Sequence, residues 1–462
     1  MGGTNAMGAT DEAGELLRRL QAVGARHLWV VYHNHSALAQ AKSVEPGRFA
    51  EVARDGVSFA KANWDFAITD EQHPHPGFAA DSGDFRVVPD PASLVRIPYR
   101  DGVWQVYGWL VDDIGEPWAG DPRARLRDQV AALAEHGTAR VAFESEFFLA
   151  RREGDGWVPA DHGRMFTVDE IEARWDWSAR VLDALDASGV GVHQFAKEYG
   201  PAQYELSLFP ADPLTAVDRF CVARQVVRAL AREVGLVATF MPKPWTDRPA
   251  NGIHVHLSLV DRDGREMIPD PDDPDGLSPA GRAVVAGLLE HAAGQAALGA
   301  PTPNSYKRLL PGSWAPAHRC WGLGNRAALV RVPGRGPNRH LEYRLADASA
   351  NPYHLVTGLL AASVDGLERR PALPDPAAID VGHLSDSEAA ALGFERLPSS
   401  PGAALDALEA DRVLCAALGP LVVEHFLAIK RFELDAYLAA TGLAPGATEV
   451  TDWERDAYLE HV

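Results

Sequence analysis

The first 112 residues alternate short apolar runs with Gly and Pro, a pattern typical of strands separated by turns. An amphipathic repeat over 12–23 predicts a helix ahead of these runs. β-Branched and aromatic residues predict strands over 27–33, 84–90, 94–98 and 104–113. The pattern therefore indicates a strand-rich N-terminal unit over residues 1–112.

Helical and strand-like segments alternate over residues 113–462. Thr167-x-x-Glu170 has the spacing of a capping box and predicts the start of one helix. Helices are expected over 123–137, 167–189, 214–235, 279–298, 353–365, 402–417 and 420–441. Strands are expected over 139–150, 203–210, 236–244 and 253–260, with tight strand–loop segments over 304–346. This alternation is typical of an α/β or α+β catalytic domain with a barrel-like sheet.

The composition is that of a globular chain, with 46% hydrophobic and 23% charged residues. A formal net charge of −20 argues against nonspecific binding to nucleic acid or to an anionic membrane, although a local basic pocket can still hold an anion. Three widely spaced cysteines predict neither disulfides nor a cysteine zinc site and favour a cytoplasmic location. No signal-peptide core and no run of 18 apolar residues occur, so no membrane span is expected.

Two carboxylates, Glu144 and Glu146, interrupt the apolar run VAFESEFFLA. Alternate residues of a strand share a face, so these side chains are expected to lie side by side. Neighbouring carboxylates in a hydrophobic strand repel each other unless a cation neutralises them. The pair is therefore either part of a metal site or part of the solvent-exposed face of an antiparallel strand.

Two further segments carry residues of ligand type. Glu198 and Glu205 flank a Gly-Pro turn and can face one point; alternatively, Glu198 is a capping or surface residue and Glu205 an exposed strand residue. In GIHVHLSL, His254 and His256 share one strand face, with Ser258 next along it. A lone histidine is more often a satisfied core residue, and two on one face favour a ligand role only modestly.

Glu342 and Arg344 repeat the same alternate spacing in HLEYRLADASANPYH. Carboxylate oxygens suit Mg²⁺ or Mn²⁺, and an imidazole also fits Mn²⁺. Five glutamates with one or two histidines would make a two-metal site without cysteine.

A basic group lies in sequence among these acids. Each member alone is most simply a surface residue, but together they are typical of a clamp for phosphate and carboxylate groups. The residues are Lys307, Arg308, Arg326 and Arg331. A two-metal site with an arginine clamp is the equipment of phosphoryl transfer.

Several long segments, in this order, resemble the glutamine synthetase family. KPWTDRPANGIHVHLS (243–258) is similar to its ATP-region signature. NSYKRLLPG, GNRAALVRVPG and LEYRLADASANPYH are similar to motifs of its catalytic barrel, and the C-terminal segment is similar to its closing helices. The resemblance covers nearly the whole chain.

The resemblance implies an α+β protein with an N-terminal β-grasp domain over 1–112 and a catalytic α/β barrel over 113–462. It also implies a homododecamer of two hexameric rings, with each active site between adjacent subunits. The implied ligands are glutamate, ATP, a small amine and two or three Mg²⁺ or Mn²⁺ ions. Neither nucleic acid nor a membrane is an expected partner.

The resemblance assigns roles by position. Glu146, Glu198 and Glu205 match the ligands of a first metal, and Glu144, His254 and Glu342 match those of a second metal nearer the nucleotide phosphates. Arg308 and Arg344 match arginines that hold the amino-acid substrate, with His254 on the same side; Arg326 and Arg331 face the phosphates; His256 and Ser258 line the nucleotide side. Arg308, Arg326 and Arg344 are the implied catalytic residues. The implied chemistry is attack of a γ-carboxylate on ATP, followed by displacement of phosphate by an amine.

The chain departs from the family at the site expected to receive the amine. Where glutamine synthetases carry a glutamate that binds ammonium, this loop reads GSWAP and places Trp314 there. The partner aspartate falls on Ala60, unless Asp65 or Asp70 substitutes for it. Ammonium leaving water needs carboxylate partners, whereas an indole offers an apolar wall and a cation–π face. The alternative for Trp314 is packing within its loop.

Three smaller departures accompany this one. Ala250 replaces a glycine whose backbone approaches glutamate, which leaves the acid substrate less firmly implied. The loop FERLPSS lacks the tyrosine that some bacterial members adenylylate, so this control is not expected. The resemblance implies a funnel-shaped active site, and Trp245 and Trp321 are expected to narrow it together with Trp314.

Three hypotheses for function follow. The first is a glutamate–amine ligase that uses ATP to make a γ-glutamyl amide from an organic amine. The second is a glutamine synthetase that uses ammonia, against which Trp314 argues. The third is a non-catalytic binding relative, but all six positions for metal ligands are filled.

Overall fold

The computed structural model describes residues 5–73, 77–444 and 446–462, and its N-terminal unit contains a six-stranded mixed sheet. The strand order is β2-β1-β6-β4-β3, with β5 paired to β6. Its elements are α1 (Asn5–Ala22), β1 (His27–His33), β2 (Ala39–Val44), α2 (Phe49–Asp55), β3 (Val57–Ala60), β4 (Asp84–Pro89), β5 (Val95–Arg96) and β6 (Val103–Val111). The helix and the four strands expected here are confirmed, whereas β2, α2 and β3 are additional.

The second sheet is larger and has nine strands in the order β14-β15-β16-β12-β7-β10-β9, with β8 and β11 paired to β7. Its strands are β7 (Thr138–Glu153), β8 (Gly156–Pro159), β9 (Val192–Lys197), β10 (Gln203–Leu208), β11 (Val237–Thr239), β12 (Ile253–Val260), β14 (Trp321–Leu323), β15 (Val330–Val332) and β16 (Leu341–Tyr343). The strands curve into a nearly closed barrel, so the expected barrel-like sheet and mixed fold class are confirmed.

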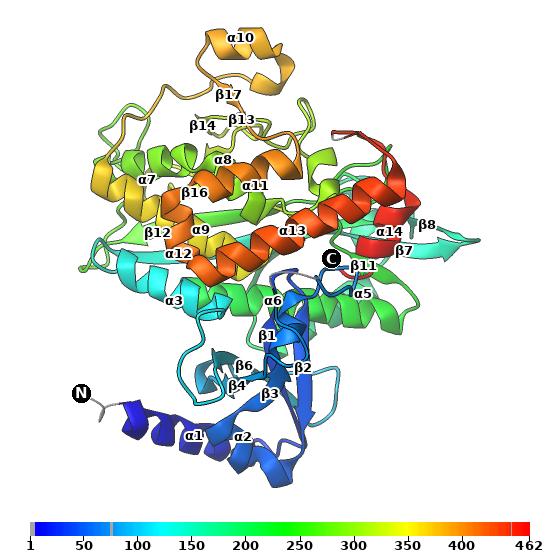
Figure 1. Cartoon of the computed structure of the whole chain (residues 1–462). Coiled ribbons are helices and arrows are strands. Elements are labelled where there is room, and N and C mark those ends of the chain that lie inside the picture. Colours follow the sequence, from blue (N-terminus) through cyan, green and yellow to red (C-terminus); the bar gives the residue numbers. More distant parts are fainter. Residues whose placement is uncertain (1–4, 74–76, 445) are drawn as a thin grey trace.

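Helices cover the large sheet, and Figure 1 shows the N-terminal sheet below it, with α3 and α6 at the level between the two sheets. The covering helices are α3 (Pro122–Leu133), α6 (Pro213–Glu233), α7 (Pro279–Glu290), α8 (Ala292–Gly299), α9 (Pro352–Arg369), α11 (Pro401–Ala410), α12 (Arg412–Leu418), α13 (Pro420–Thr441) and α14 (Asp452–Tyr458). At Gly287 in α7, an added Cβ would lie 2.2 Å from the carbonyl oxygen of Ala362 in α9, so a glycine permits this close helix contact.

The long helices begin where a side chain can cap them. Asp212 accepts a hydrogen bond from the amide of Thr215 at the start of α6. Asn351 accepts bonds from the amides of Tyr353 and His354 at the start of α9. Both helices have proline in their first turn, where its missing N–H costs nothing.

Three predicted helices are interrupted. The helix expected over 167–189 is divided into α4 (Val168–Glu172) and α5 (Trp175–Ala187). Thr167 is the N-cap residue of α4, so the predicted helix start is confirmed, but its side chain makes no capping hydrogen bond. The helix over 279–298 breaks at His291, whose ring bonds two aspartates on neighbouring helices. The helix over 402–417 breaks at Asp411, which caps α12.

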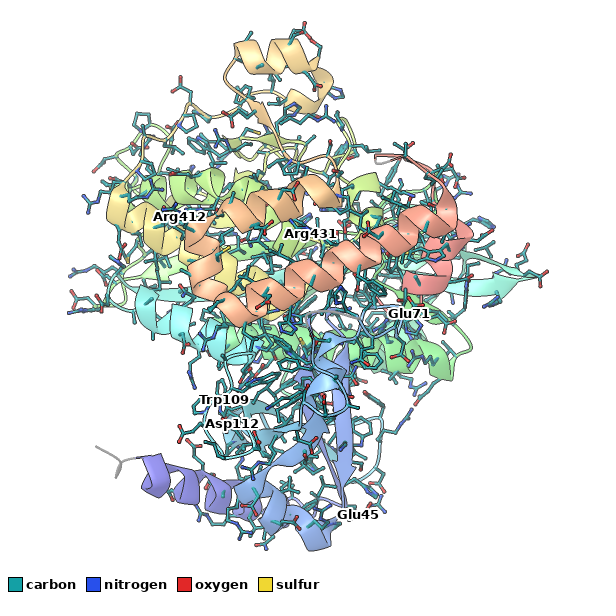
Figure 2. All side chains as sticks on the ribbon, viewed as in Figure 1. Glu45, Glu71, Trp109, Asp112, Arg412 and Arg431 are labelled. Carbon is teal, nitrogen blue, oxygen red and sulfur yellow. The ribbon has the colours of Figure 1, made fainter. Side chains whose placement is uncertain are left out.

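The N-terminal unit meets α3 and α6 through a buried charged contact. Arg123 at the start of α3 pairs with Asp90 beside the N-terminal sheet at 2.7 Å and with Asp218 of α6 at 2.8 Å. Tyr353 donates a hydrogen bond to Asp218 at 2.6 Å. The Arg123 guanidinium also lies 4.1 Å from the ring centroid of Trp109 on β6, which Figure 2 labels. These bonds neutralise groups that burial would otherwise leave unsatisfied.

Within the described ranges, no single helix is long and apolar enough to cross a membrane. The adjoining α12 and α13 meet the criteria of length and composition only as a pair, and they are bent by 105° to each other.

Candidate active site

The predicted site residues come together through strand register. In the pairing of β10 with β7, Glu205 lies opposite Glu146. On the other edge of β7, His254 of β12 lies opposite Glu144. Residues directly opposite on neighbouring strands have Cβ atoms about 4.5–5.5 Å apart and share a face. The alternate spacing seen in the sequence therefore produces a cluster across three strands.

The same register extends the cluster across two more strands. His256 of β12 lies opposite Glu342 of β16, and Glu342 lies opposite Arg331 of β15. Ser258 follows on the same face of β12, one step further from the acids. We call Glu144, Glu146, Glu205, His254, His256 and Glu342 the carboxylate row.

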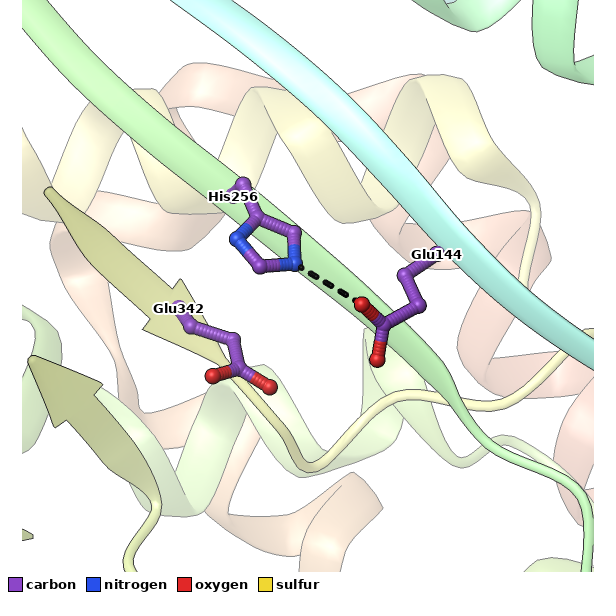
Figure 3. A group of neighbouring side chains, drawn as sticks. All are labelled: Glu144, His256 and Glu342. Carbon is purple, nitrogen blue, oxygen red and sulfur yellow. Dashed lines mark ion pairs between the residues drawn. The ribbon is translucent and has the colours of Figure 1, made fainter. Parts of the chain in front are cut away.

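The centre of the row is a close group of two carboxylates and two imidazoles. The Nδ1 atom of His254 lies 2.7 Å from Glu144 Oε1 and 3.6 Å from Glu342 Oε1. The Nε2 atom of His256 lies 3.5 Å from Glu144 Oε2. Figure 3 shows His256 pointing toward Glu144, with the carboxylate of Glu342 beside them. One ligand-type atom from each of Glu144, His256 and Glu342 lies within 4.8 Å of the others, a spacing that suits one cation.

Two glutamates at the other end of the row, Glu146 and Glu205, form a strongly acidic group with Glu198, which lies outside the row but acts on both. Burial raises the pKa of Glu205 to about 9, and the charges of Glu144 and Glu146 act in the same direction. Burial raises the pKa of Glu146 to about 7, against the charge of Arg308. Burial also raises the pKa of Glu198. A bound cation would reverse these shifts, because it favours the ionised carboxylates.

At the centre of the row, hydrogen bonds outweigh the effect of burial on the carboxylate pKa. Burial alone would raise the pKa of Glu144, but hydrogen bonds from His254 and His256 lower it overall. Burial and the charge of Arg344 lower the pKa of His254 to about 4, so its ring is neutral at pH 7. A neutral imidazole next to an ionised carboxylate is the donor pair that a divalent metal binds.

Of the four arginines predicted for the site, three are already engaged with protein groups. Arg331 donates to Glu342 Oε2 at 2.7 Å, and Arg344 donates to Glu342 Oε1 and, at 2.8 Å, to the carbonyl of Arg326. Arg308 is buried and donates to the backbone carbonyls of residues 344 and 345 at 2.9 and 2.6 Å. The side chain of Arg326 is exposed at the edge of the site. Of the four, Arg326 therefore has the freest guanidinium for a phosphate group.

Lys307 does not belong to the clamp. It is 2% exposed and pairs with Glu454 of α14 at 2.6 Å, so its predicted place in the basic group is wrong. A buried lysine ammonium is costly unless a carboxylate pairs with it, and Glu454 is that partner.

The three tryptophans differ. Trp321 is fully buried and donates its indole N–H to the carbonyl of Pro374 at 2.7 Å, so it packs in the core and does not narrow the funnel. Trp245 is 9% exposed and bonds the carbonyl of Trp157 at 2.8 Å. Trp314 is 71% exposed, and its backbone has φ of 64°. Packing within this chain therefore does not account for Trp314.

The loop that carries Trp314 is held by a hydrogen bond to the backbone of Arg308. The hydroxyl of Ser313 donates to the carbonyl of Arg308 at 2.8 Å. On the N-terminal sheet, Ala60 is exposed at the end of β3. Asp65 is buried, accepts bonds from the amide of Phe78 and pairs with His425 at 2.6 Å, so it cannot substitute for the missing aspartate. Asp70 remains exposed.

Two residues of the site were not found from the sequence. Gln203 at the start of β10 donates to the carbonyl of Ala250 and to Asn251 Oδ1, each at 2.9 Å, and so fixes the segment that precedes His254. His340 contacts His256 at 2.9 Å. It lies two residues before Glu342, and the alternate spacing His340-x-Glu342-x-Arg344 was the signal that could have revealed it.

Comparison with known proteins agrees with this geometry. A family model described as the catalytic domain of glutamine synthetase matches residues 119–458. The chain belongs to the glutamine synthetase family. The glutamine synthetase of Methanocaldococcus jannaschii is 36% identical over 389 residues, which cover 82% of this chain and 84% of that protein. The glutamine synthetase of Pyrococcus abyssi is 33% identical over 442 residues, covering 93% and 95%.

Solved structures of the family have the same overall fold. A structure described as a GmaS/ADP complex superposes with a TM-score of 0.82 at 30% identity and covers 96% of this chain and 98% of its own. A structure described as a novel glutamine synthase homolog has a TM-score of 0.81 at 31% identity, with coverage of 94% and 99%. The resemblance seen in the sequence is confirmed.

The donor set fits the divalent cations that this ligase family uses. Carboxylate oxygens and one imidazole suit Mg²⁺ and Mn²⁺, and no thiolate lies among the described donors of the row. Burial, together with the charges of the neighbouring glutamates, raises the pKa of Glu205, so a bound cation would favour the ionised form of this group. Glu146, Glu198 and Glu205 could hold one cation, and Glu144, Glu342 and a histidine a second.

Proposed function

We propose that this glutamine synthetase-family ligase joins the γ-carboxylate of glutamate to an organic amine and converts ATP to ADP and phosphate. The observation that carries the proposal is Trp314, an exposed indole at the position where the resemblance expects a glutamate for ammonium. An ammonium ion taken from water loses hydration that a carboxylate would replace, whereas an indole face contacts the apolar part of a larger amine.

The proposed reaction has two steps. An oxygen of the γ-carboxylate attacks the terminal phosphorus of ATP, and ADP leaves. The amine nitrogen then attacks the carbonyl carbon of γ-glutamyl phosphate, inorganic phosphate leaves, and the nitrogen loses a proton. Bound Mg²⁺ or Mn²⁺ would supply charge neutralisation of the phosphates during this chemistry.

The chain's own residues hold and orient the reactants. Exposed Arg326 lies at the site edge, where its charge acts on Glu198 and could equally reach a phosphate. Arg331 and Arg344 donate to the two oxygens of Glu342 and so fix the orientation of its carboxylate. We propose that Arg344 also holds the glutamate substrate. Arg308 has both terminal nitrogens on backbone carbonyls, so we assign it to shaping the wall of the glutamate site beside Gly252.

Two of the three positions considered for a second carboxylate do not supply one, which supports the same preference. The resemblance places Ala60 where a neighbouring subunit would contribute an aspartate, and Asp65 is buried and paired with His425, so only exposed Asp70 is left of the three. This comparison assumes the family's double-ring dodecamer, which we propose for this chain as well; the mass of the assembly measured by mass photometry tests it.

The test is phosphate release with ATP, glutamate and Mg²⁺, using either ammonium or a panel of monoamines, polyamines, amino alcohols and aromatic amines. We expect at least one organic amine to exceed ammonium in kcat/KM by about tenfold or more, the scale of one apolar contact in a pocket. Trp314→Glu should lower that ratio by about tenfold. Trp175→Glu, at another exposed tryptophan, is the control and should leave it unchanged.

Two results would overturn the proposal. Turnover with ammonium equal to that with the best amine, unchanged in Trp314→Glu, would indicate a glutamine synthetase that uses ammonia. No affinity for ATP in the presence of Mg²⁺ would indicate a non-catalytic relative.

A further inference from the structure

Three aromatic side chains of the described chain are more exposed to solvent than any other. They are Trp314, Tyr199 and Phe166, which are 71%, 67% and 58% exposed. Single exposed apolar residues are common on protein surfaces, but several large rings around one polar site are typical of a ligand-binding surface. The role of Trp314 is proposed above, whereas Tyr199 and Phe166 have none so far.

Tyr199 follows Glu198 directly, in a turn that is held by several hydrogen bonds. Its backbone N–H donates to Glu198 Oε2 at 2.7 Å. The Nζ atom of buried Lys197 donates to the carbonyls of Glu198 and Gly200 at 2.9 and 2.5 Å. The amide of Gly200 donates to Gln203 Oε1 at 2.8 Å. The backbone that carries the Tyr199 ring is therefore fixed beside a carboxylate of the acidic group.

Phe166 is bonded to the end of the strand that leads into this turn, and its backbone is strained. Its N–H donates to the carbonyl of Lys197 at 3.1 Å. Its φ of 54° lies in the left-handed region, which a bulky side chain rarely adopts. Trp314, with φ of 64°, is the other aromatic residue of the described chain with positive φ. Backbone strain of this kind clusters at ligand sites, so its occurrence at two exposed aromatic rings favours a functional role for both.

The two aromatic segments approach the same group of carboxylates. The charge of Arg308 lowers the pKa of Glu146, and the charge of Glu198 raises it, so both residues lie close to Glu146. The loop of Trp314 is bonded to the backbone of Arg308, and the turn of Tyr199 carries Glu198. The exposed rings therefore border a strongly acidic group, which attracts the protonated form of an amine.

We propose that Phe166 and Tyr199, together with Trp314, contact the organic part of the amine, and that the preferred substrates are primary alkylamines of several carbon atoms. This inference rests on the proposed function and adds the substrate class. The carboxylates attract the nitrogen, and the rings remove the carbon chain from water. A longer chain covers more of the aromatic surface, so the preference should increase with chain length.

The test compares kcat/KM for methylamine, ethylamine, propylamine and butylamine with ATP, glutamate and Mg²⁺. Each methylene buried against the rings should raise kcat/KM about fourfold in the wild-type protein. Phe166→Gly removes one ring and relieves the strained backbone, and Tyr199→Ala removes the other; each should reduce the factor to about twofold or less. Tyr199→Phe keeps the ring and should keep most of the factor. Phe209→Ala, at an exposed ring beyond the other end of β10, is the control and should keep the fourfold factor.

Three results would overturn the inference alone. The first is a chain-length factor that is unchanged in both Phe166→Gly and Tyr199→Ala. The second is a raised KM for ATP with an unchanged amine series, which would show that the rings contact the nucleotide. The third is a smaller assembly by mass photometry with an unchanged amine series, which would show that the rings contact another subunit. A wild-type protein that prefers ammonium to every amine would instead refute the proposed function, and this inference with it.

Discussion

Binding of Mg²⁺ should release protons from the acidic end of the carboxylate row. With a pKa of about 9, Glu205 is almost fully protonated at pH 7.5 in the metal-free protein. Glu146, with a pKa of about 7, is about one-quarter protonated at this pH. A metal ligand must be deprotonated, so cation binding should displace these protons. The two residues together give about one proton per chain at pH 7.5.

The number of protons released should decrease as the pH rises. Above pH 9 Glu205 ionises without help, so the release should fall to about 0.2 protons per chain at pH 9.5. Glu205→Gln should remove about one proton from the release at pH 7.5. Glu395→Gln, at an exposed carboxylate on β17 (Glu395–Arg396), should leave the count unchanged.

Isothermal titration calorimetry measures this count directly. Mg²⁺ is titrated into metal-free protein in two buffers of different ionisation enthalpy, and the difference between the observed enthalpies gives the protons released. A release that is the same at pH 7.5 and 9.5, or that is unchanged in Glu205→Gln, would refute the assignment of Glu205 as a protonated ligand awaiting a cation.

Two predictions concern stability. Lys307→Met leaves Glu454 buried without its cation and should lower the free energy of unfolding by about 3–5 kcal/mol. Arg18→Met, at an exposed ion pair, should change it by less than about 1 kcal/mol. Urea unfolding compares the two variants, and equal midpoints would contradict the prediction. Burial lowers the pKa of His33 and of His354 to about 3 in the folded protein. As the pH falls below about 6.5, these histidines are therefore protonated in the unfolded chain but not in the folded protein. Each residue should lower the free energy of unfolding by about 2 kcal/mol between pH 7.5 and 5. His354→Phe should therefore show a smaller loss over this range in urea titrations, and an unchanged loss would contradict that expectation.

The site was predictable from the sequence as far as strand periodicity extends. Glu144 and Glu146 share a face because alternate strand residues must, and the same holds for His254 and His256. The pairing of β12 with β7 and β16 depends on contacts between residues about a hundred positions apart, which no local pattern records. The resemblance to glutamine synthetases supplied what periodicity could not.

Other features depend on packing that the local pattern does not determine. The strand β2 is mostly exposed and polar, so no apolar alternation marks it. The helix α2 buries Phe49, Val52 and Ala53 at helical spacing, but with seven residues it is too short for this pattern to stand out. The basic residues were expected to face a ligand together, but Lys307 is buried against Glu454, because a buried carboxylate needs the nearest cation. The alternate spacing of His340 with Glu342 was visible in the sequence, but its contact with His256 depends on the pairing of β12 with β16, which no local pattern records.

The transfer of oxygen from glutamate to phosphate tests the central claim most directly. Glutamate labelled with ¹⁸O in its γ-carboxylate is incubated with the protein, ATP, Mg²⁺ and the best amine of the panel, and the phosphate and amide products are analysed by mass spectrometry. A γ-glutamyl phosphate intermediate predicts one labelled oxygen in each phosphate released, together with an equal amount of γ-glutamyl amide. Unlabelled phosphate alongside full amide formation, or phosphate without any amide, would contradict the account.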